Sequence, residues 1–235
     1  LAFSSGALTP DTSTAVTVTA GVATQIAINA GNGQSAAVNT AVATPPSAIV
    51  RDVSNNPVAG VSVSFAVASG GGSILPVTPV VSNASGIAAL TSWTMGTVAG
   101  PNSITAASGT LIGSPVTFTA TGTAGAATQL QVATQPSPTA QSGVAFAVQP
   151  AIRLADALGN PVATSGTVVT AAIGSGTGTL GGTLTATTVS GVATFTNLAI
   201  SGTAGAFTLN FTAGGVTGVS SATITLGAGA ANRLA

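Results

Sequence analysis

The sequence lacks nearly all the side chains that carry chemistry. Its 235 residues include no cysteine and no histidine, and only 3% are charged, where an average domain has about 25%. Without cysteine there is neither a disulfide framework nor a thiol site, and without histidine or cysteine no nucleophilic triad can be built. We therefore predict no catalytic, cofactor-binding or metal site and expect that the protein is not an enzyme.

The shortage of charge also limits the partners. The sequence has three arginines, no lysine and three aspartates, whereas a nucleic-acid-binding protein neutralises about 6–10 phosphates with basic side chains. Anionic membranes are likewise recognised by clusters of lysine and arginine. No apolar run approaches the roughly 18 residues of a membrane span. We expect neither a nucleic-acid partner nor a membrane span in this sequence.

What remains to hydrate the surface is threonine, serine, asparagine, glutamine, glycine and alanine. The net charge is zero, a condition that favours association between molecules. Strand edges without lysine are also open to pairing with another strand. The composition therefore predicts self-association with copies of the same chain or with adjacent repeats.

One phrase recurs along the chain. It reads A-G-V-A-T-Q-I from Ala20, A-G-A-A-T-Q-L from Ala124 and A-G-A-A-N-R-L from Ala228, a spacing of 104 residues each time. Such a period indicates a tandem array. We predict two complete units, residues 20–123 and 124–227, each large enough to bury its own core.

The two ends extend the same pattern. L-A-F-S-S-G-A-L-T-P at residues 1–10 aligns with L-N-F-T-A-G-G-V-T-G at residues 209–218, an offset of 208, or twice the period. We interpret residues 1–19 as the C-terminal strands of a preceding repeat and residues 228–235 as the start of a following one. The simplest expectation is a longer natural chain.

Hydrophobic residues alternate with a period of two inside each unit. In the first, Val61, Val63, Phe65 and Val67 alternate with small polar residues or alanine, as expected of half-buried strands. About seven short strands per unit, separated by turn residues, indicate an antiparallel sandwich. The predicted strands are residues 23–29, 47–53, 61–67, 73–80, 86–92, 102–107 and 114–121, and then 127–133, 144–156, 167–173, 180–186, 191–198, 205–212 and 219–226.

The connection between the units is short. The last predicted strand of the first unit ends with V-T-F-T-A at residues 116–120. The chain then runs through T-G-T-A-G-A-A into the first strand of the next unit at Thr128. A linker of a few residues without a long Ser/Gly tract restricts swing between neighbours. We expect the units to lie end to end, as a rod of beads.

Three further stretches carry a family resemblance. They read V-R-D-V-S-N-N-P-V-A-G-V-S-V-S-F from Val50, S-N-A-S-G-I-A-A-L from Ser82 and A-G-P-N-S-I-T-A from Ala99, with counterparts from Asp156, Thr188 and Gly202. This pattern resembles the bacterial immunoglobulin-like repeats of invasin- and intimin-type adhesins. The resemblance implies tandem immunoglobulin-like antiparallel β-sandwich domains in an end-to-end array, an all-β fold, with export and a structural or adhesive role.

The sequence departs from the family in two places. The V-S-V-S-F alternation of the first unit becomes a looser T-S-G-T-V-V-T-A from Thr164, so the units should differ in detail. Nothing in the sequence resembles the receptor-binding cap at the tip of invasin-type proteins. We therefore assign this sequence to a stalk rather than a tip.

Asp52 and Asp156 are equivalent positions, each four residues before the asparagine of an Asn-Pro pair. A carboxylate there could ligate calcium between domains, but calcium takes six to eight oxygens and usually several carboxylates. No second acid lies nearby in the sequence. We predict instead that each aspartate accepts backbone N–H bonds within a turn.

The arginines allow two interpretations. Arginine is enriched at binding hot spots, so Arg51, Arg153 and Arg233 could anchor a partner. However, Arg51 adjoins Asp52, and Arg153 precedes Asp156 by three residues. We predict local Arg–Asp pairs.

The remaining candidates concern sugar. Trp93, with Met95, could stack on a carbohydrate, but its place after a predicted strand favours core or interdomain packing. Asn83 and Asn210 match the N-glycosylation sequon, a pattern that often arises by chance, and Asn210 falls within a predicted strand.

Taken together, these features favour a structural repeat segment of an exported bacterial cell-surface or extracellular protein, either an adhesin stalk or a filament body. Its function would be reach and cohesion. The alternatives are a carbohydrate- or receptor-binding immunoglobulin-like module that contacts surface glycans, and a phage decoration domain.

Overall fold

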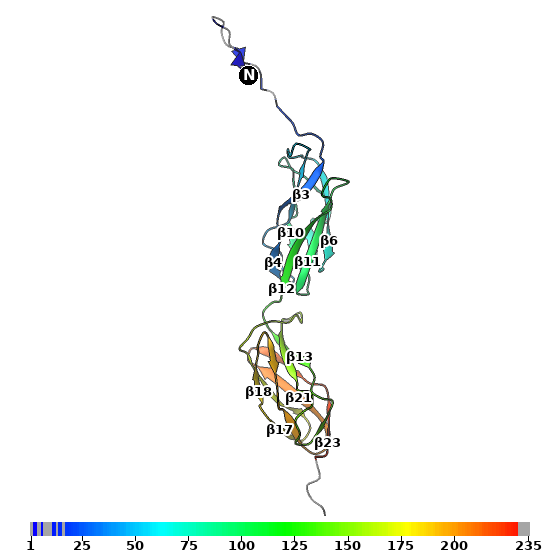
Figure 1. Ribbon diagram of the computed structural model, residues 1–235, viewed down its shortest axis with the longest axis vertical. Helices are drawn as coiled ribbons and strands as arrows, with labels where there is room; N and C mark the ends of the chain where they lie inside the picture. Colours follow the sequence, from blue (N-terminus) through cyan, green and yellow to red (C-terminus); the bar gives the residue numbers. More distant parts are fainter. Residues whose placement is uncertain (1, 4–5, 7–10, 13, 16, 230–235) are drawn as a thin grey trace, which may run out of the picture.

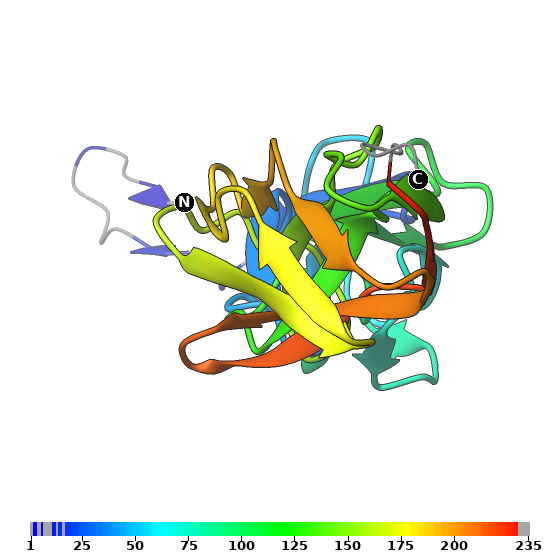
Figure 2. The ribbon, with the colours of Figure 1, turned by 90° about the horizontal axis from the view of Figure 1, so that it is seen from below.

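The computed structural model describes residues 2–3, 6, 11–12, 14–15 and 17–229, without the side chains of Phe3 and Asp11. They form two β-sandwiches, one after the other along the long axis (Figure 1). Viewed along that axis, the second sandwich lies in front of the first (Figure 2). The described residues include no helix, and hence none there that could cross a membrane.

The first sandwich contains two sheets and a ribbon. A five-stranded sheet has the order β4-β12-β11-β6-β8, a three-stranded sheet has the order β3-β5-β9, and β7 pairs with β10. The strands are β3 (Gln25–Ala30), β4 (Gln34–Ala37), β5 (Ser47–Arg51), β6 (Ser62–Ser69), β7 (Ser73–Leu75), β8 (Val80–Val81), β9 (Ile87–Ala89), β10 (Ser92–Thr94), β11 (Gly100–Ala107) and β12 (Val116–Thr123).

The second sandwich repeats this arrangement. Gln129 of β13 pairs in parallel with Thr217 of β22, as Gln25 does with Ile112 in the first sandwich. Because β22 also pairs with β21, this contact joins the two sheets of the second sandwich into one path. The strands are β13 (Gln129–Thr134), β14 (Thr139–Gln141), β15 (Ala151–Ala155), β16 (Val168–Ser175), β17 (Gly178–Gly181), β18 (Thr185–Thr187), β19 (Val192–Thr194), β20 (Ala199–Gly202), β21 (Gly205–Ala213), β22 (Val216–Ser220) and β23 (Ile224–Gly227).

A strand that changes sheets makes this arrangement immunoglobulin-like. The chain pairs as β3 with β5 in one sheet, crosses over, and then runs as β4 in parallel with β12 in the other. In the second sandwich β14 pairs in the same way with β23. Facing sheets with such a crossover form an immunoglobulin-like sandwich, so the predicted all-β immunoglobulin-like fold is confirmed for each sandwich.

Each sandwich has its own core, built by the predicted alternation. Val63 and Phe65 of β6 pack with Ile104 of β11 and Phe118 of β12 in the first. The second core is built around three alternate residues of β21, namely Phe207, Leu209 and Phe211. Alternate residues of a strand point to the same face of its sheet. The apolar faces of the two sheets in each sandwich therefore pack against each other and form its core.

Six of the predicted strands are interrupted or shortened in the structure. Residues 73–80 contain only β7, which ends before Pro76, and the start of β8. Residues 144–156 contain only β15, which begins after Pro150. Residues 191–198 contain only β19. Proline cannot donate a ladder hydrogen bond, which accounts for the interruptions at Pro76 and Pro150. The predicted ranges 86–92, 180–186 and 219–226 each contain parts of two strands, namely β9 and β10, β17 and β18, and β22 and β23. The short strands β4, β14 and β20 were not predicted.

Outside the two sandwiches, β1 (Ala2–Phe3) pairs with β2 (Asp11–Thr12). The remaining described residues of the segment 1–19 form no strand.

Candidate functional site: the junction between the sandwiches

A tight turn follows β5 in the first sandwich and is centred on Asp52. The carboxylate oxygen Oδ1 accepts hydrogen bonds of 2.9 Å from the backbone N–H groups of Ser54 and Asn56. Oδ2 accepts from the backbone of Gly21 at 2.8 Å and from the side chain of Asn56 at 3.0 Å. The carboxylate is saturated by four donors, so the predicted turn role of Asp52 is confirmed.

The turn after β15 is built in the same way around Asp156. Oδ1 accepts from the backbone N–H groups of Leu158 and Asn160, each at 2.9 Å, and Oδ2 accepts from Gly125 at 2.9 Å. The Nδ2 group of Asn160 donates to Oδ2 at 3.0 Å. With their oxygens occupied, the two carboxylates have no lone pairs aimed at a metal. In the described part of the chain, nowhere do three His, Cys, Asp or Glu side chains come together.

These turns explain the recurring phrase. Gly21 and Gly125 of the phrase donate to the aspartate side chains, while Gln25 and Gln129 donate to the backbone carbonyls of Asp52 and Asp156, at 3.0 and 2.7 Å. The phrase and the D-x-x-x-N motif lie apart in the sequence, and sequence reasoning did not connect them. In the structure they are the two halves of one hydrogen-bonded unit.

Hydrogen bonding lowers the pKa of both aspartates. The side chain of Asn56, followed by the N–H of Gly21, lowers the pKa of Asp52 to about 2. Burial raises the pKa of Asp156, but the donors from Gly125 and Asn160 outweigh burial, and the net pKa is lowered. Both carboxylates are therefore ionised at neutral pH and act as fixed acceptors.

Asn160 extends its turn across the junction. Its Nδ2 group donates to the backbone carbonyl of Thr97 at 2.9 Å, and its Oδ1 accepts from the backbone N–H of Ala99 at 2.8 Å. Both residues belong to the loop between β10 and β11 of the first sandwich. Asn160 is only 5% exposed, and both ends of its amide are bonded to one loop. We name this contact the Asn160 clasp.

The clasp was not predicted from the sequence. In the sequence, Asn160 stands out only as the last residue of D-x-x-x-N, directly before proline. The turn alone explains these residue types, so they give no sign of a contact with the neighbouring sandwich. Its counterpart, Asn56, lies at the opposite end of the first sandwich and is exposed. The second role of the asparagine therefore depends on what the turn faces.

A shallow cleft of about 430 Å³ adjoins the clasp and is shared by both sandwiches. The first sandwich contributes residues 38–40, and the second contributes residues around Gly125 and Asp156. The side chain of Leu158 is half exposed at its wall. The sandwiches thus contact each other around a small gap.

The predicted Arg–Asp pairs are wrong. Arg153 donates through Nε and Nη2 to Oε1 of Gln131, at 3.1 and 2.8 Å, because these two residues are direct partners across β13 and β15. Arg51 is not among the donors to Asp52, whose carboxylate is filled by Gly21, Ser54 and Asn56. Arg233 lies outside the described residues.

Trp93 and Met95 lie in the first core, 0% and 1% exposed. The predicted core packing of Trp93 is confirmed, and a buried ring cannot stack on a sugar. Its Nε1 group has no hydrogen-bond partner among the described residues. Of the sequon residues, Asn210 lies within β21, as predicted. The side chain of Asn83 accepts from the backbone of Ser85 and Ile87 in a turn.

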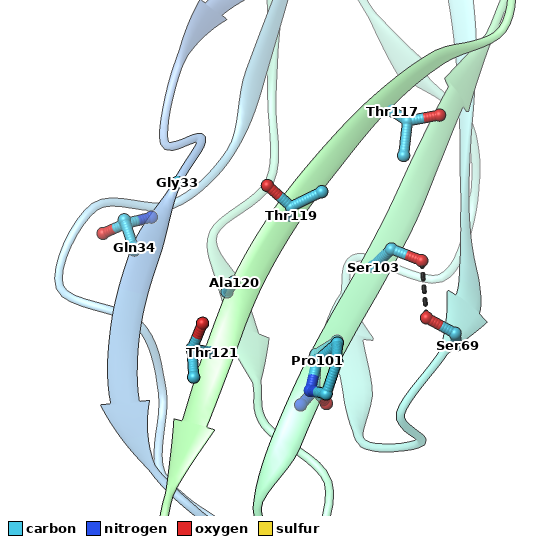
Figure 3. A pocket seen from close by; sticks show the side chains of 10 residues that line it. Gly33, Gln34, Ser69, Pro101, Ser103, Thr117, Thr119, Ala120 and Thr121 are labelled. Atoms are coloured by element: carbon cyan, nitrogen blue, oxygen red, sulfur yellow. Dashed lines mark hydrogen bonds between the residues drawn. The ribbon is translucent and has the colours of Figure 1, made fainter.

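A second concave surface lies on the five-stranded sheet of the first sandwich (Figure 3). This trough, about 420 Å³ in volume, contains no charged side chain. Thr117, Thr119 and Thr121 line it from β12 (Figure 3), and Ser103 of β11 shares a 2.7 Å hydrogen bond with Ser69 of β6. We name it the hydroxyl trough. It offers neutral hydrogen-bonding groups but no general base or activated nucleophile.

No family model and no curated protein matches the sequence. Among solved structures, the chain is similar to the Escherichia coli adhesin FdeC, with 19% identity and a TM-score of 0.47 over 91% of this chain and 67% of that one. It is also similar to InvD of Yersinia pseudotuberculosis, with 21% identity and a TM-score of 0.41 over 86% of this chain and 58% of that one. The D0-D1 domain of intimin gives 19% identity and a TM-score of 0.35 over 87% and 98% of the two chains. The chain is thus similar to bacterial immunoglobulin-like domains of the invasin and intimin type.

Proposed function

We propose that this chain is a structural spacer, a non-catalytic repeat segment of an exported bacterial surface or extracellular protein. Its sandwiches supply length, and its junctions set the angle between neighbours. The Asn160 clasp carries the proposal, because one side chain bonds a loop of the neighbouring sandwich through both its donor and its acceptor. Such a contact fixes the orientation of one sandwich relative to the next, which a spacer of defined shape requires.

The length of the linker supports the same role. Only residues 124–128 separate β12 from β13, and Gly125 in their midst is bonded to Asp156. Because the linker is short and hydrogen-bonded to the second sandwich, it restricts rotation of one sandwich relative to the other. Repetition of the unit at a period of 104 residues would build a rod, as an adhesin stalk or the body of a filament.

Cohesion between such rods is the second part of the proposal. Edge strand β8 carries an exposed Val81, and the edge strands β8 and β9 contain no charged residue. Natural edges usually carry charge or proline to prevent strand addition. Since the net charge is zero, no electrostatic repulsion keeps copies apart.

Localisation tests the proposal. Antibodies against the purified chain should label extended structures on the exterior of intact source cells, seen by immunogold electron microscopy. Labelling confined to the cytoplasm would contradict the proposal, and labelling of phage particles would assign the chain to phage decoration.

The hydroxyl trough favours a second candidate function, the binding of neutral glycans. Its threonine and serine hydroxyls match the hydrogen-bonding groups of sugars, and Thr119 lies at its centre among Thr117 and Thr121 (Figure 3). Binding on a glycan array that disappears in Thr119→Val but persists in Thr212→Val, a change on the second sandwich, would support it. Absence of binding by the unmodified chain would dismiss it.

A further inference from the structure

The first sandwich carries a copy of the clasp residue that bonds no loop outside its own turn among the described residues. Asn56 occupies the position equivalent to Asn160, and its Nδ2 group donates to Asp52 at 3.0 Å, as Asn160 does to Asp156. Asn160 is 5% exposed beneath the loop it binds, whereas Asn56 is exposed. Among the described residues, the hydrogen bonds of Asn56 stay within its own turn. The turn around Asp52 fixes the orientation of the Asn56 amide. Within the described part of the chain, its Oδ1 and the second hydrogen of its Nδ2 group have no hydrogen-bond partner.

The complementary loop is exposed at the other end of the molecule. In the first sandwich the clasped loop lies between Trp93, whose carbonyl accepts from Val42, and the start of β11. In the second, the carbonyl of Leu198 accepts from Phe146, and β21 starts at Gly205. The counterpart of residues 97–99 is therefore residues 202–204, which are the last residue of β20 and the two residues that link it to β21.

This loop keeps the groups that a clasp requires. Residues 202–204 are exposed. The carbonyl of Gly202 accepts one hydrogen bond, of 3.1 Å, from Ser142, and a carbonyl oxygen has a second lone pair. The N–H of Ala204 corresponds to that of Ala99.

We propose that Asn56 is a docking site for a second copy of this chain. The occupant is the connection at residues 202–204 of that copy, at the end of β20, with Asn56 donating to the carbonyl of Gly202 and accepting from the N–H of Ala204. The template is the Asn160 clasp within the chain. Residues 17–20, which leave the sandwich at this end, are exposed and form no strand, so no described element covers Asn56.

The contact is heterologous, since the two copies use different surfaces. Repetition of a heterologous contact produces an open chain of molecules rather than a closed dimer. The proposed contact rests on the proposed structural function, because docking of copies end to end adds length. It differs from cohesion through strand edges, which would place copies side by side.

Two single variants test the contact from its two sides. Asn56→Ala removes both groups of the clasp, and Thr203→Glu places a charge in the opposite loop, where docking would bring it towards Asp52 of the other copy. By sedimentation equilibrium up to the solubility limit, the unmodified chain should show a mass that rises with concentration. Each variant should weaken this association about tenfold or more, while its sandwiches still unfold in cooperative thermal transitions.

A mixture of the variants provides the sharper test. The Asn56→Ala copy retains an intact loop, and the Thr203→Glu copy retains an intact Asn56, so one contact remains possible between them. The mixture should form one-to-one heterodimers and no longer species. An unmodified chain that stays monomeric, a variant that associates like the unmodified chain, or a mixture that forms no heterodimer would each overturn the proposal. None of these results depends on where the protein is found, so localisation tests the proposed function separately.

Discussion

The side-chain oxygen of Asn160 accepts a hydrogen bond of 2.8 Å from the backbone N–H of Ala99. The turn after β15 therefore does two things: it satisfies Asp156 inside the second sandwich, and it binds the β10–β11 loop of the first. The amide side chain of Asn160 takes part in both, and backbone N–H groups supply the other hydrogen bonds to Asp156.

Replacement of Asn160 by alanine should release the loop. The N–H of Ala99 would lose its acceptor, so its hydrogen exchange, measured by NMR, should accelerate about tenfold or more. Asn56→Ala is the matched control, because it removes the same side chain from the same kind of turn but not from the junction. Equal exchange at Ala99 in the Asn160→Ala and unmodified chains would show that the clasp does not form in solution.

Acid should destabilise both sandwiches through their turn aspartates. The folded-state pKa of Asp52 is about 2, below the roughly 3.9 of an unfolded aspartate, and that of Asp156 is also lowered. The unfolded chain then binds protons first, so this stabilisation is complete above about pH 5 and is lost as the pH falls through 4 towards 2.

The measurement is the free energy of urea unfolding, by circular dichroism, across that pH range. Aspartates are the only side chains in the sequence that titrate there, since glutamate and histidine are absent. Asp52→Asn with Asp156→Asn should be less stable at neutral pH and should flatten the profile. A flat profile for the unmodified chain would refute the role assigned to the carboxylates.

The two cores should unfold as separate units. Trp93 is the only tryptophan, tyrosine is absent, and the ring is buried in the first core, so its fluorescence reports the first sandwich alone. Phe118→Ala should lower the stability of that sandwich by about 3–5 kcal/mol and shift the transition seen by Trp93. Phe211→Ala, an equally buried change in the second core, should shift only the remaining circular dichroism transition. A Trp93 transition that moves equally with both variants would indicate a single cooperative unit.

The S-G-I-A and S-G-V-A steps should depend on their glycines. Gly86 has φ +72°, and a Cβ there would meet the carbonyl oxygen of Val50 at 2.5 Å. Gly191 has φ +82° and would meet the carbonyl oxygen of Val162. Gly60 is the control, with φ +79° and open space around it. Alanine at Gly86 or Gly191 should cost about 1–3 kcal/mol more unfolding free energy than alanine at Gly60, and equal costs in chemical denaturation would contradict this.

The sequence was most informative about the sheets. Alternation such as Val63 and Phe65 predicts which face is buried, because the period of a strand is two whatever the strand pairs with. The same pattern does not show that the first strand of each sandwich changes sheets. Strands β4 and β14 are short, and their residues are only partly buried or exposed, so they leave no hydrophobic period.

The site was harder to predict because its residues act through tertiary neighbours. Asp52 and Asp156 were placed correctly in turns, since an aspartate that accepts nearby backbone N–H groups is a local arrangement. Arg153 was paired with the wrong partner, because proximity in the sequence was taken as proximity in space, whereas Gln131 is its neighbour across the sheet. Asn160 and Asn56 have the same local surroundings in the sequence, and only the neighbouring sandwich distinguishes their roles.

The central claim is that the junction holds the sandwiches at a fixed angle. The most direct measurement is the distribution of distances between spin labels at Ser64→Cys on β6 and Thr170→Cys on β16, both exposed, by pulsed electron paramagnetic resonance. The chain has no cysteine of its own, so both labels are site-specific. We predict one narrow distribution that broadens when Asn160→Ala is added. A distribution that is already broad with Asn160 in place, and unchanged without it, would contradict the account.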